Sequence, residues 1–428
     1  MPRQDIRMPA LDGMRGVASI MVVVGHFFSN AHPFYKQMPL TRLMAYVPDY
    51  FGFGNFGVVL FFCLSSFLLS FLFVREFDKY RKNNVKWFFF RRSLRIWPLY
   101  FCFLLIINLA VYFQLLPAET YTQTKIYLER YNVLLFTYLP NWIYATNIFV
   151  DGVPSNTGFL NVLWSLGVEE QIYILFPFVA GLLLVSRRRL PLIIILITLS
   201  CVSRIIYIIL CKLTLNGGMY YSTLSYIDIY LIAGIFGAFH ARNEHSIFDD
   251  LISSKYTFIA ALVLLSIFMH QLQVNGLPPY HASVLITYPI LGILASYFLI
   301  FVVRSDGGII ARILSVPFSR VCGFLAYSAY IWHVFILMFL NHYFFETNLY
   351  SPHGVANSIS FQACFFLLYL GLIFSISCLS HGFIELPFLR IKENFSVTGG
   401  VNIFSWKRYF ACSITFSGFM FCFLWCLR

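Results

Sequence analysis

Charged side chains are scarce in this sequence. Asp, Glu, Lys and Arg make up 11% of its 428 residues, and 59% of the residues are hydrophobic. A soluble globular domain carries roughly one-quarter charged residues, so a soluble fold is excluded. Alternating segments of strand length are also lacking, which favours an all-α protein.

Cysteine patterns typical of metal sites are missing as well. The ten cysteines form no CxxC pair and no Cys/His cluster with metal-ligand spacing. Most of them fall inside apolar stretches, where cysteine behaves as a small apolar residue. We therefore expect no bound metal. No permanently bound cofactor is expected either.

Long apolar stretches recur along the whole chain instead. Each has about 17 to 25 residues, enough to cross a hydrocarbon core as a helix. The first apolar stretch is better explained as a retained membrane span than as a signal peptide. The basic segment that precedes it is long, and no small-x-small cleavage site follows it. The predicted fold is an all-α integral membrane protein, a polytopic bundle of about eleven helices. The expected spans lie near 16–31, 56–74, 96–115, 168–186, 190–211, 225–240, 256–273, 283–303, 321–341, 360–382 and 409–427.

The formal net charge of +12 is explained by the way the basic residues are distributed between the two sides of the membrane. With a cytoplasmic N-terminus, most lysines and arginines fall in cytoplasmic segments, as the positive-inside rule requires. We therefore predict a cytoplasmic N-terminus and an extracytoplasmic C-terminus, and nucleic acid is not implied as a partner. In the longest outer segment, about 116–164, the stretch 127–143 is expected to be a short helix or a re-entrant piece.

One histidine interrupts the first apolar stretch. His26 follows Arg15 by eleven residues, which in an α-helix returns to within about 20° of the same direction and climbs about 16 Å. Ionisable side chains inside spans are costly and by default mark function. Histidine can act as a general base near neutral pH. A single structural hydrogen bond explains a lone histidine equally well, but the arginine in register favours function.

Two arginines stand at the entrance to the third expected span. Arg92 and Arg95 are three residues apart, so a helix turns both guanidinium groups to one side. Arginine binds phosphate through paired hydrogen bonds, and the pair suits a phosphorylated ligand on the same side as Arg15. A positive-inside anchor is the alternative, and for a generic protein it is the more frequent one.

An acidic pair opens the fourth expected span. Glu169 and Glu170 follow a Trp-Ser-Leu sequence. The helix dipole explains part of this placement, and a catalytic role is the alternative. Arg204, Asp228 and His333 also fall in expected spans and are candidates for structural pairing with these carboxylates.

Together these motifs resemble the acyltransferase-3 family, membrane proteins that O-acylate bacterial surface glycans, nodulation factors and some secreted small molecules. The matching segments follow the family's order over about residues 10–390. They are Leu11 to Ala18 leading to Gly25-His26, Arg92-x-x-Arg95 with Pro98 and Tyr100, Leu163 to Glu169, Ala326 to His333, and Glu385-Leu386-Pro387. Each segment is weak alone, whereas the ordered set is quite specific.

The resemblance implies an acyl-CoA donor, usually acetyl-CoA, bound from the cytoplasm. It also implies a hydroxyl acceptor on a glycan, a lipid-linked sugar or a related molecule. By carry-over, His26 is the catalytic histidine, acting as a general base or as a transient acyl carrier, and Arg15 is its paired arginine. Arg92 and Arg95 join Arg15 in the donor site.

The remaining family positions are expected to support this site. Glu169 matches the acidic catalytic position better than Glu170 does. Asp12, one turn before Arg15, is expected to orient that arginine. Lesser roles are expected for Trp164, Glu170, His333 and Glu385.

The resemblance also divides the chain. It makes 1–390 an acyltransferase-3-like transmembrane domain and leaves 391–428 as a cytoplasmic loop with an extra C-terminal transmembrane helix and no soluble domain. Some family members carry a fused extracytoplasmic hydrolase-like domain. The acyl group is therefore expected to be transferred directly, or with the aid of a separate extracytoplasmic partner. The protein is expected to lie in the inner membrane of a bacterium, in contact with membrane lipid.

A polytopic transporter or flippase is the main competing interpretation. Intramembrane His, Arg and Asp line substrate paths in such proteins. Paired inverted halves and matched broken helices, which would favour it, are not recognisable in the sequence. A purely structural membrane subunit leaves the register of Arg15 and His26 unexplained.

Overall fold

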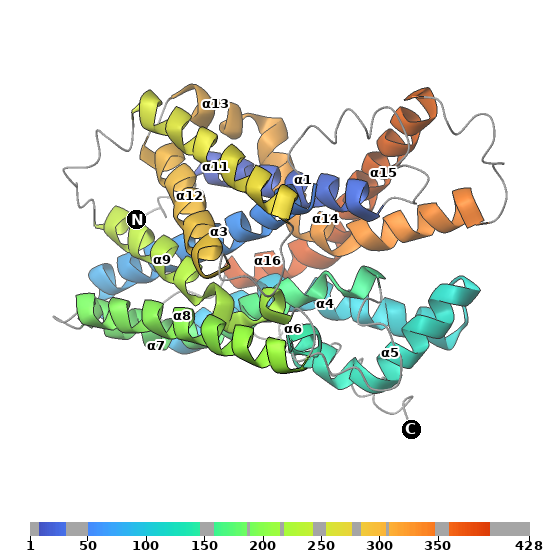
Figure 1. Ribbon diagram of the computed structural model, residues 1–428, viewed down its shortest axis with the longest axis horizontal. Helices are drawn as coiled ribbons and strands as arrows, with labels where there is room; N and C mark the ends of the chain where they lie inside the picture. Colours follow the sequence, from blue (N-terminus) through green and yellow to red (C-terminus); the bar gives the residue numbers. More distant parts are fainter. Residues whose placement is uncertain are drawn as a thin grey trace.

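The computed structural model of the protein consists of helices and their connections. It describes residues 8–30, 50–145, 158–185, 189–214, 218–242, 254–275, 284–304, 308–346 and 359–393, and all regular structure in these ranges is helical. In the view of Figure 1, α4, α5, α7 and α8 lie along one side of the molecule and α11, α12, α13 and α15 along the other. The α-helices are α1 (Pro9–Asn30), α3 (Tyr50–Tyr80), α4 (Val85–Tyr112), α5 (Ala118–Phe136), α6 (Pro140–Ala145), α7 (Leu163–Val185), α8 (Arg189–Thr214), α9 (Ile227–Ala241), α11 (Lys255–Asn275), α12 (Val284–Arg304), α13 (Ile309–Ser315), α14 (Pro317–Asn341), α15 (Ile359–Ser380) and α16 (Leu386–Glu393). Short 3-10 turns are η2 (Gly158–Leu160), η3 (Gly218–Tyr221) and η4 (Thr223–Tyr226), and π-helical turns are η5 (His342–Glu346) and η6 (His381–Glu385).

Seven helical segments in the described ranges are long and apolar enough to cross a membrane. They are Pro9–Phe28, Gly54–Tyr80, Val85–Tyr112, Gly158–Gly181, Thr223–Ala241, Pro317–Phe344 and Ala363–Ile391. The bent pair Tyr288–Arg304 and Ile309–Ser315 raises the number to eight if it forms one span. The protein is therefore an all-helical, multi-pass membrane protein, as the composition predicts.

The expected number of about eleven spans is larger than this count. Two of the expected spans coincide with α8 and α11, whose apolar segments in the described residues are shorter, Ile194–Ile206 and Lys255–Ile267. The expected span 409–427, with most of the predicted segment 391–428, lies outside the described residues. The region around 127–143 forms α5 and α6, and neither helix is among the candidate spans.

Helix α1 packs closely between α14 and α3. Small residues allow this approach, as is usual between membrane helices. A Cβ atom added to Gly323 of α14 would lie 1.8 Å from the carbonyl oxygen of Asp12, and one added to Gly13 of α1 would lie 1.9 Å from the carbonyl oxygen of Leu314. The start of α1, which carries Asp12 and Arg15, is thereby held directly against α13 and α14.

We expect Gly323→Ala to destabilise the protein. The added methyl group meets the backbone of Asp12, which cannot move without displacing α1, and overpacking of this kind costs about 1–3 kcal/mol. Thermal unfolding in detergent measures the effect. Gly371→Ala on α15 is the matched control, because nothing lies within 4 Å of its added Cβ; equal unfolding temperatures for the two variants would contradict the close approach.

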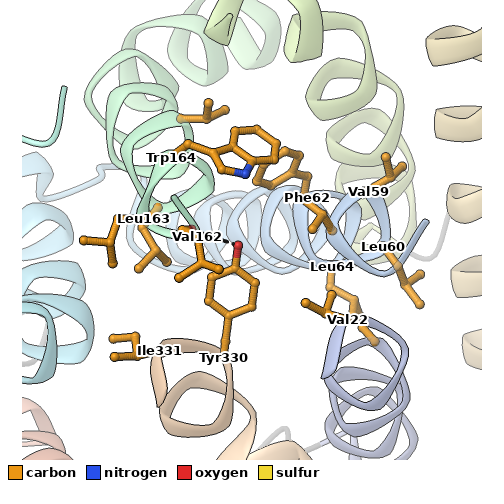
Figure 2. Close-up of a cluster of buried hydrophobic side chains, with 14 of the residues drawn as sticks. Val22, Val59, Leu60, Phe62, Leu64, Val162, Leu163, Trp164, Tyr330 and Ile331 are labelled. Atoms are coloured by element: carbon orange, nitrogen blue, oxygen red, sulfur yellow. Dashed lines mark hydrogen bonds between the residues drawn. The ribbon is translucent and has the colours of Figure 1, made fainter. Parts of the chain in front are cut away.

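A buried apolar cluster joins four helices around the start of α7. Figure 2 shows Val22 of α1, Phe62 and Leu64 of α3, Trp164 of α7 and Tyr330 of α14 within it. The Tyr330 hydroxyl donates to the Val162 carbonyl oxygen at 3.0 Å. This cluster fixes the relative positions of the helices that carry the candidate site.

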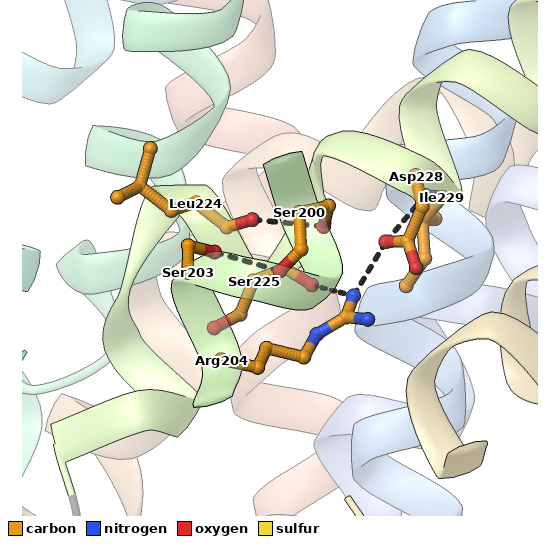
Figure 3. Close-up of polar contacts among 7 residues, drawn as sticks. All are labelled: Ser200, Ser203, Arg204, Leu224, Ser225, Asp228 and Ile229. Carbon is orange, nitrogen blue, oxygen red and sulfur yellow. Dashed lines mark hydrogen bonds and ion pairs between the residues drawn. The ribbon is translucent and has the colours of Figure 1, made fainter. Parts of the chain in front are cut away.

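Helices α8 and α9 are joined by a buried ion pair. Arg204 donates from Nη2 to Asp228 Oδ1 at 2.6 Å and to the Ser225 carbonyl oxygen at 2.5 Å (Figure 3). Both side chains are almost fully buried. Arg204 therefore pairs with Asp228, and the expectation that these two residues pair with Glu169 or Glu170 is wrong.

Candidate active site

Four arginines line a cavity of about 420 Å³ near the start of α1. Arg15 comes from α1, and Arg91, Arg92 and Arg95 come from the first turns of α4; the C-terminal half of α3 forms the opposite wall. The predicted grouping of Arg15 with the Arg92 and Arg95 pair therefore exists in space, although these residues belong to helices far apart in the sequence.

The turn between α3 and α4 fixes one side of this cavity. Asn84 caps α4 by accepting a hydrogen bond from the Trp87 backbone N–H at 3.2 Å. Glu76 of α3 accepts from the Asn84 backbone N–H at 3.0 Å and from the Arg91 guanidinium, also at 3.0 Å. The first helical turns of α4 are thus tied to α3, which sets the direction of its arginines.

Within the described residues, two of the four arginines have a carboxylate partner. Arg91 pairs with Glu76, and Arg15 pairs with Asp12 at 3.0 Å, one turn earlier in the same helix. The expected orienting contact between Asp12 and Arg15 is therefore present.

Arg92 and Arg95 have no carboxylate within ion-pair distance in the described part of the chain. The guanidinium of Arg92 lies over the Tyr173 ring, 5.4 Å from its centroid, and Arg95 lies in the wall of the cavity. Cations without a carboxylate in direct contact are costly inside a membrane protein. The cavity is therefore suited to an anionic ligand, and arginine favours phosphate or carboxylate groups.

A second cavity of about 510 Å³ adjoins the first. Asp12, Arg15 and Arg95 line both cavities and form their common wall. The second cavity continues between α3, α7, α14 and η6, where two further carboxylates line it, Glu169 and Glu385. A ligand that is anionic at one end and longer than the arginine cavity can thus extend into a mixed polar and apolar space.

Hydroxyl groups hold Glu169 and Glu385 in the second cavity. Glu169 accepts hydrogen bonds from Ser65 and from Tyr173, one turn along α7. Glu385 accepts from Ser328 of α14 and lies 3.2 Å from Nδ1 of His381. Both side chains are therefore fixed in the cavity wall.

The neighbouring Glu170 lies elsewhere. The indole N–H of Trp97 donates to its Oε2 at 3.3 Å, and its Oε1 has no hydrogen-bond partner. Tyr138, before α6, is close to this carboxylate, and burial raises the pKa of its hydroxyl well above the ordinary value. Glu170 does not line either of the two cavities, which agrees with the better motif match of Glu169.

His26 lies beside a second histidine. Its Nδ1 is 3.0 Å from the Val22 carbonyl oxygen, and its ring contacts the ring of His333 edge to face, with the centroids 4.8 Å apart. The His333 ring lies 5.7 Å from the ring of Tyr330, and Tyr330 lines the second cavity. His26 itself is not in the lining of either cavity, so the rings of His333 and Tyr330 connect it to the cavity.

Trp164 has a packing role in the structure. Its ring packs against Tyr220 at a centroid distance of 4.7 Å and against Tyr221 at 5.3 Å, and it does not line either cavity. The sequence did not single out Ser65, Tyr173 and Ser328, which hold the carboxylates. Tyr173 could have been found from its spacing, because four residues after Glu169 it lies on the same helix face. A serine in an apolar span has no comparable pattern in the sequence.

The described residues contain no group of three or more His, Cys, Asp or Glu side chains that could hold a metal ion. Their chemistry is that of an anion site joined to a polar cavity, inside a multi-pass helical membrane protein.

Comparison with known proteins adds the family. The family model for the Acyltransferase domain of the acyltransferase 3 family matches residues 8–381, and the chain belongs to that family. It is therefore a multi-pass membrane protein of an acyltransferase family. No solved structure matches it.

Its relatives include staphylococcal O-acetyltransferases. The chain is 25% identical over 392 residues to "Putative O-acetyltransferase SAS0844" of Staphylococcus aureus strain MSSA476, covering 90% of this chain and 57% of the relative. It is 25% identical over 362 residues to O-acetyltransferase OatA of Staphylococcus aureus strain NCTC 8325, covering 79% of this chain and 52% of the relative. The chain spans about half the length of the curated relatives it matches.

Proposed function

We propose that this membrane acyltransferase moves an acetyl group from acetyl-CoA to a hydroxyl of a glycan or glycolipid. The donor binds at the arginine cavity, on the cytoplasmic side of an inner bacterial membrane. The observation that carries the proposal is the pair of arginines without a carboxylate partner in the described residues, Arg92 and Arg95, in a cavity that shares a wall with a second cavity.

The arginine cavity suits the phosphorylated end of CoA. Its phosphates are anions that arginine binds through paired, charge-assisted hydrogen bonds. The pantetheine arm, which is uncharged, would extend past Arg15 and Arg95 into the second cavity. Glu169 and Glu385 could accept hydrogen bonds there from the amide N–H groups of the arm or from acceptor hydroxyls, because an ionised carboxylate is an acceptor only.

The acetyl group and the oxygen acceptor are supported by the relatives, which are named O-acetyltransferases. A glycan acceptor follows the family resemblance. Transfer to the acceptor is either direct or completed by a separate extracytoplasmic protein. In the membrane, His26 acts as a general base or as a transient acyl carrier, with Arg15 and Glu169 beside the reacting groups.

Donor binding tests the arginine cavity directly. We expect the Arg92→Gln/Arg95→Gln variant to bind CoA at least about 10-fold more weakly than wild type, because a hydrogen bond to a charged group contributes about 1.5–3 kcal/mol. Binding of tritiated CoA to the purified protein in nanodiscs measures the change.

Two controls define this experiment. Lys125→Gln removes a half-exposed cation of α5, outside both cavities, and is expected to bind CoA as wild type does. Arg91→Gln removes a cavity cation whose charge Glu76 already balances, so its effect should be smaller than that of the double variant. Unchanged CoA binding by the double variant would rule out the proposed donor site.

A further inference from the structure

We propose that His381 is the general base of acetyl transfer: its Nε2 takes the proton of the acceptor hydroxyl inside the second cavity, and Glu385 is the positioning residue that orients its ring. This inference rests on the proposed function and deepens it. It assigns the general-base role to a histidine that neither the sequence motifs nor the family resemblance single out. It is independent of whether His26 carries the acetyl group.

His381 lies in the wall of the second cavity. Among the described residues it is the only histidine in the lining of that cavity. Its side chain is 21% exposed, whereas His26 and His333 line neither of the two cavities. A general base has to lie within hydrogen-bond reach of the proton that it takes. A ligand that extends into the second cavity therefore meets His381.

The second cavity holds His381 at the same part of α14 that His26 contacts. The residue before His381, Ser380, accepts a hydrogen bond from the Trp332 indole N–H at 2.8 Å. The next residue of α14 is His333, whose ring lies 4.8 Å from that of His26. Consecutive residues of α14 thus contact the segments that carry the two histidines. His381 therefore enters the cavity at the depth at which the sequence predicts the reaction.

Glu385 fixes the tautomer of His381. The Nδ1 atom of His381 lies 3.2 Å from Oε2 of Glu385. An ionised carboxylate only accepts, so the neutral ring carries its hydrogen on Nδ1 and its lone pair on Nε2. Ser328 donates to the other oxygen of Glu385 and holds the carboxylate in place. A carboxylate orients the histidine base of Ser-His-Asp triads in the same way.

The backbone between the two side chains is a π-helical turn. This turn, η6, begins at His381 and ends at Glu385, and the Leu386 backbone N–H donates to the His381 carbonyl oxygen. Single π turns are rare and are frequently found at functional sites. Both residues at the ends of this turn line the second cavity. The turn therefore presents the histidine and its carboxylate to the cavity together.

The proton transfer balances within the reaction. The Nε2 lone pair of His381 takes the proton of the acceptor hydroxyl; the O–H bond breaks and an N–H bond forms. The acceptor oxygen attacks the acetyl carbonyl carbon; a C–O bond forms, and the bond from that carbon to the CoA sulfur breaks. The thiolate takes the proton from His381, so CoA leaves as the thiol. If His26 carries the acetyl group, the bond that breaks is the one to its ring nitrogen, and the same proton ends on the CoA sulfur released earlier.

The His381→Asn variant removes the base and keeps the contact with Glu385. The amide nitrogen of asparagine places a donor near the Nδ1 position, and the Nε2 lone pair is lost. We expect kcat for transfer to glycan hydroxyls to fall at least about 100-fold, the lower end of the usual contribution of a general base. CoA binding should be unchanged, because His381 does not line the arginine cavity.

The Glu385→Gln variant tests the positioning role. A neutral amide stabilises an imidazolium less well than a carboxylate does, so kcat for glycan hydroxyls should fall, by less than in His381→Asn. His240→Asn on α9 is the matched control. The ring of His240 stacks on Phe71 and lines neither cavity, so its replacement should leave kcat unchanged.

The choice of acceptor distinguishes a base from a residue that only supports the fold. Hydroxylamine attacks a thioester with the lone pair of its nitrogen and does not first have to lose a proton. Transfer to hydroxylamine, corrected for the uncatalysed reaction, should therefore change little in His381→Asn and Glu385→Gln. The assay uses the purified full chain in nanodiscs with radiolabelled acetyl-CoA. The acceptors are cell-wall glycan fragments, lipid-linked sugars and hydroxylamine.

The possible results separate the inference from the function on which it rests. No transfer by wild type to glycan fragments or lipid-linked sugars overturns the proposed function. Wild-type kcat for these acceptors in His381→Asn overturns the role of His381 alone. Equal losses with the sugars and with hydroxylamine also overturn it, because they show a structural defect. A loss confined to the sugar hydroxyls is the result that the inference predicts.

Discussion

His26→Ala is expected to lower acetyl transfer from acetyl-CoA at least about 100-fold. The substitution removes the imidazole that is proposed to act as a general base or as a transient acyl carrier, and general-base catalysis alone contributes about 10²–10⁴-fold to a rate. Binding of CoA at the arginine cavity should remain, because His26 does not line that cavity. The measurements are the transfer rate and the CoA dissociation constant of the same purified variant.

A matched control on the same helix accompanies this variant. Ile20→Ala removes an exposed side chain of α1 that belongs to no part of the site, and it should retain wild-type transfer. Insertion and thermal unfolding are measured for both variants. A well-folded His26→Ala protein that transfers acetyl groups at the wild-type rate would show that His26 does not take part in the reaction.

Asp228→Ala is expected to produce the largest loss of stability. It leaves the Arg204 guanidinium buried with no carboxylate, whereas in the native protein these groups are 2.6 Å apart and almost fully buried. Breaking a buried ion pair by removing one partner typically destabilises a protein by about 3–5 kcal/mol. Thermal unfolding in detergent and the yield of inserted protein measure this effect.

The exposed pair Lys125 and Glu129 provides the comparison. Its two side chains are about half exposed and 4.0 Å apart, so Glu129→Ala should change stability by less than about 1 kcal/mol. The double variant Arg204→Leu/Asp228→Leu should recover much of the stability lost in Asp228→Ala, because apolar residues of suitable size often replace a buried pair without loss. If Asp228→Ala unfolds at the wild-type temperature, the buried pair does not connect α8 and α9 as described.

Much of the helical architecture could be predicted from hydropathy, because a long apolar run inside a membrane has few alternatives to a helix. The number of spans was harder to predict. Hydropathy alone treats α8 and α11 like the other apolar helices, whereas their apolar segments in the described residues are Ile194–Ile206 and Lys255–Ile267. The bend between α12 and α13 also cannot be read from hydropathy.

The grouping of the arginines was predictable in part. Helical register places Arg92 and Arg95 on one side of α4, and one turn separates Asp12 from Arg15, so these local relations follow from the sequence. That α1 and α4 bring their arginines to one cavity depends on tertiary packing, including the close contact of α1 with α14 at Gly323. The roles assigned to these residues remain proposals.

The neighbours that His26 and Glu169 have on other helices could not be predicted from periodicity. His333 is more than 300 positions from His26, and Ser65 reaches Glu169 from another helix. The same limit explains the wrong pairing expected for Arg204 and Asp228. Buried polar groups in a membrane find partners, but the sequence does not specify which of several partners lies nearest.

The dependence of acetyl transfer on membrane orientation tests the central claim most directly. Inside-out and right-side-out membrane vesicles containing the protein are loaded with cell-wall glycan fragments and given radiolabelled acetyl-CoA from outside. The account predicts that glycan becomes labelled in inside-out vesicles only, and that one CoA thiol is released for each acetyl group transferred. Inside-out vesicles that contain the Arg92→Gln/Arg95→Gln variant or the His26→Ala variant should show no such labelling. Equal labelling in vesicles that lack the protein, or labelling that the variants do not change, would contradict it.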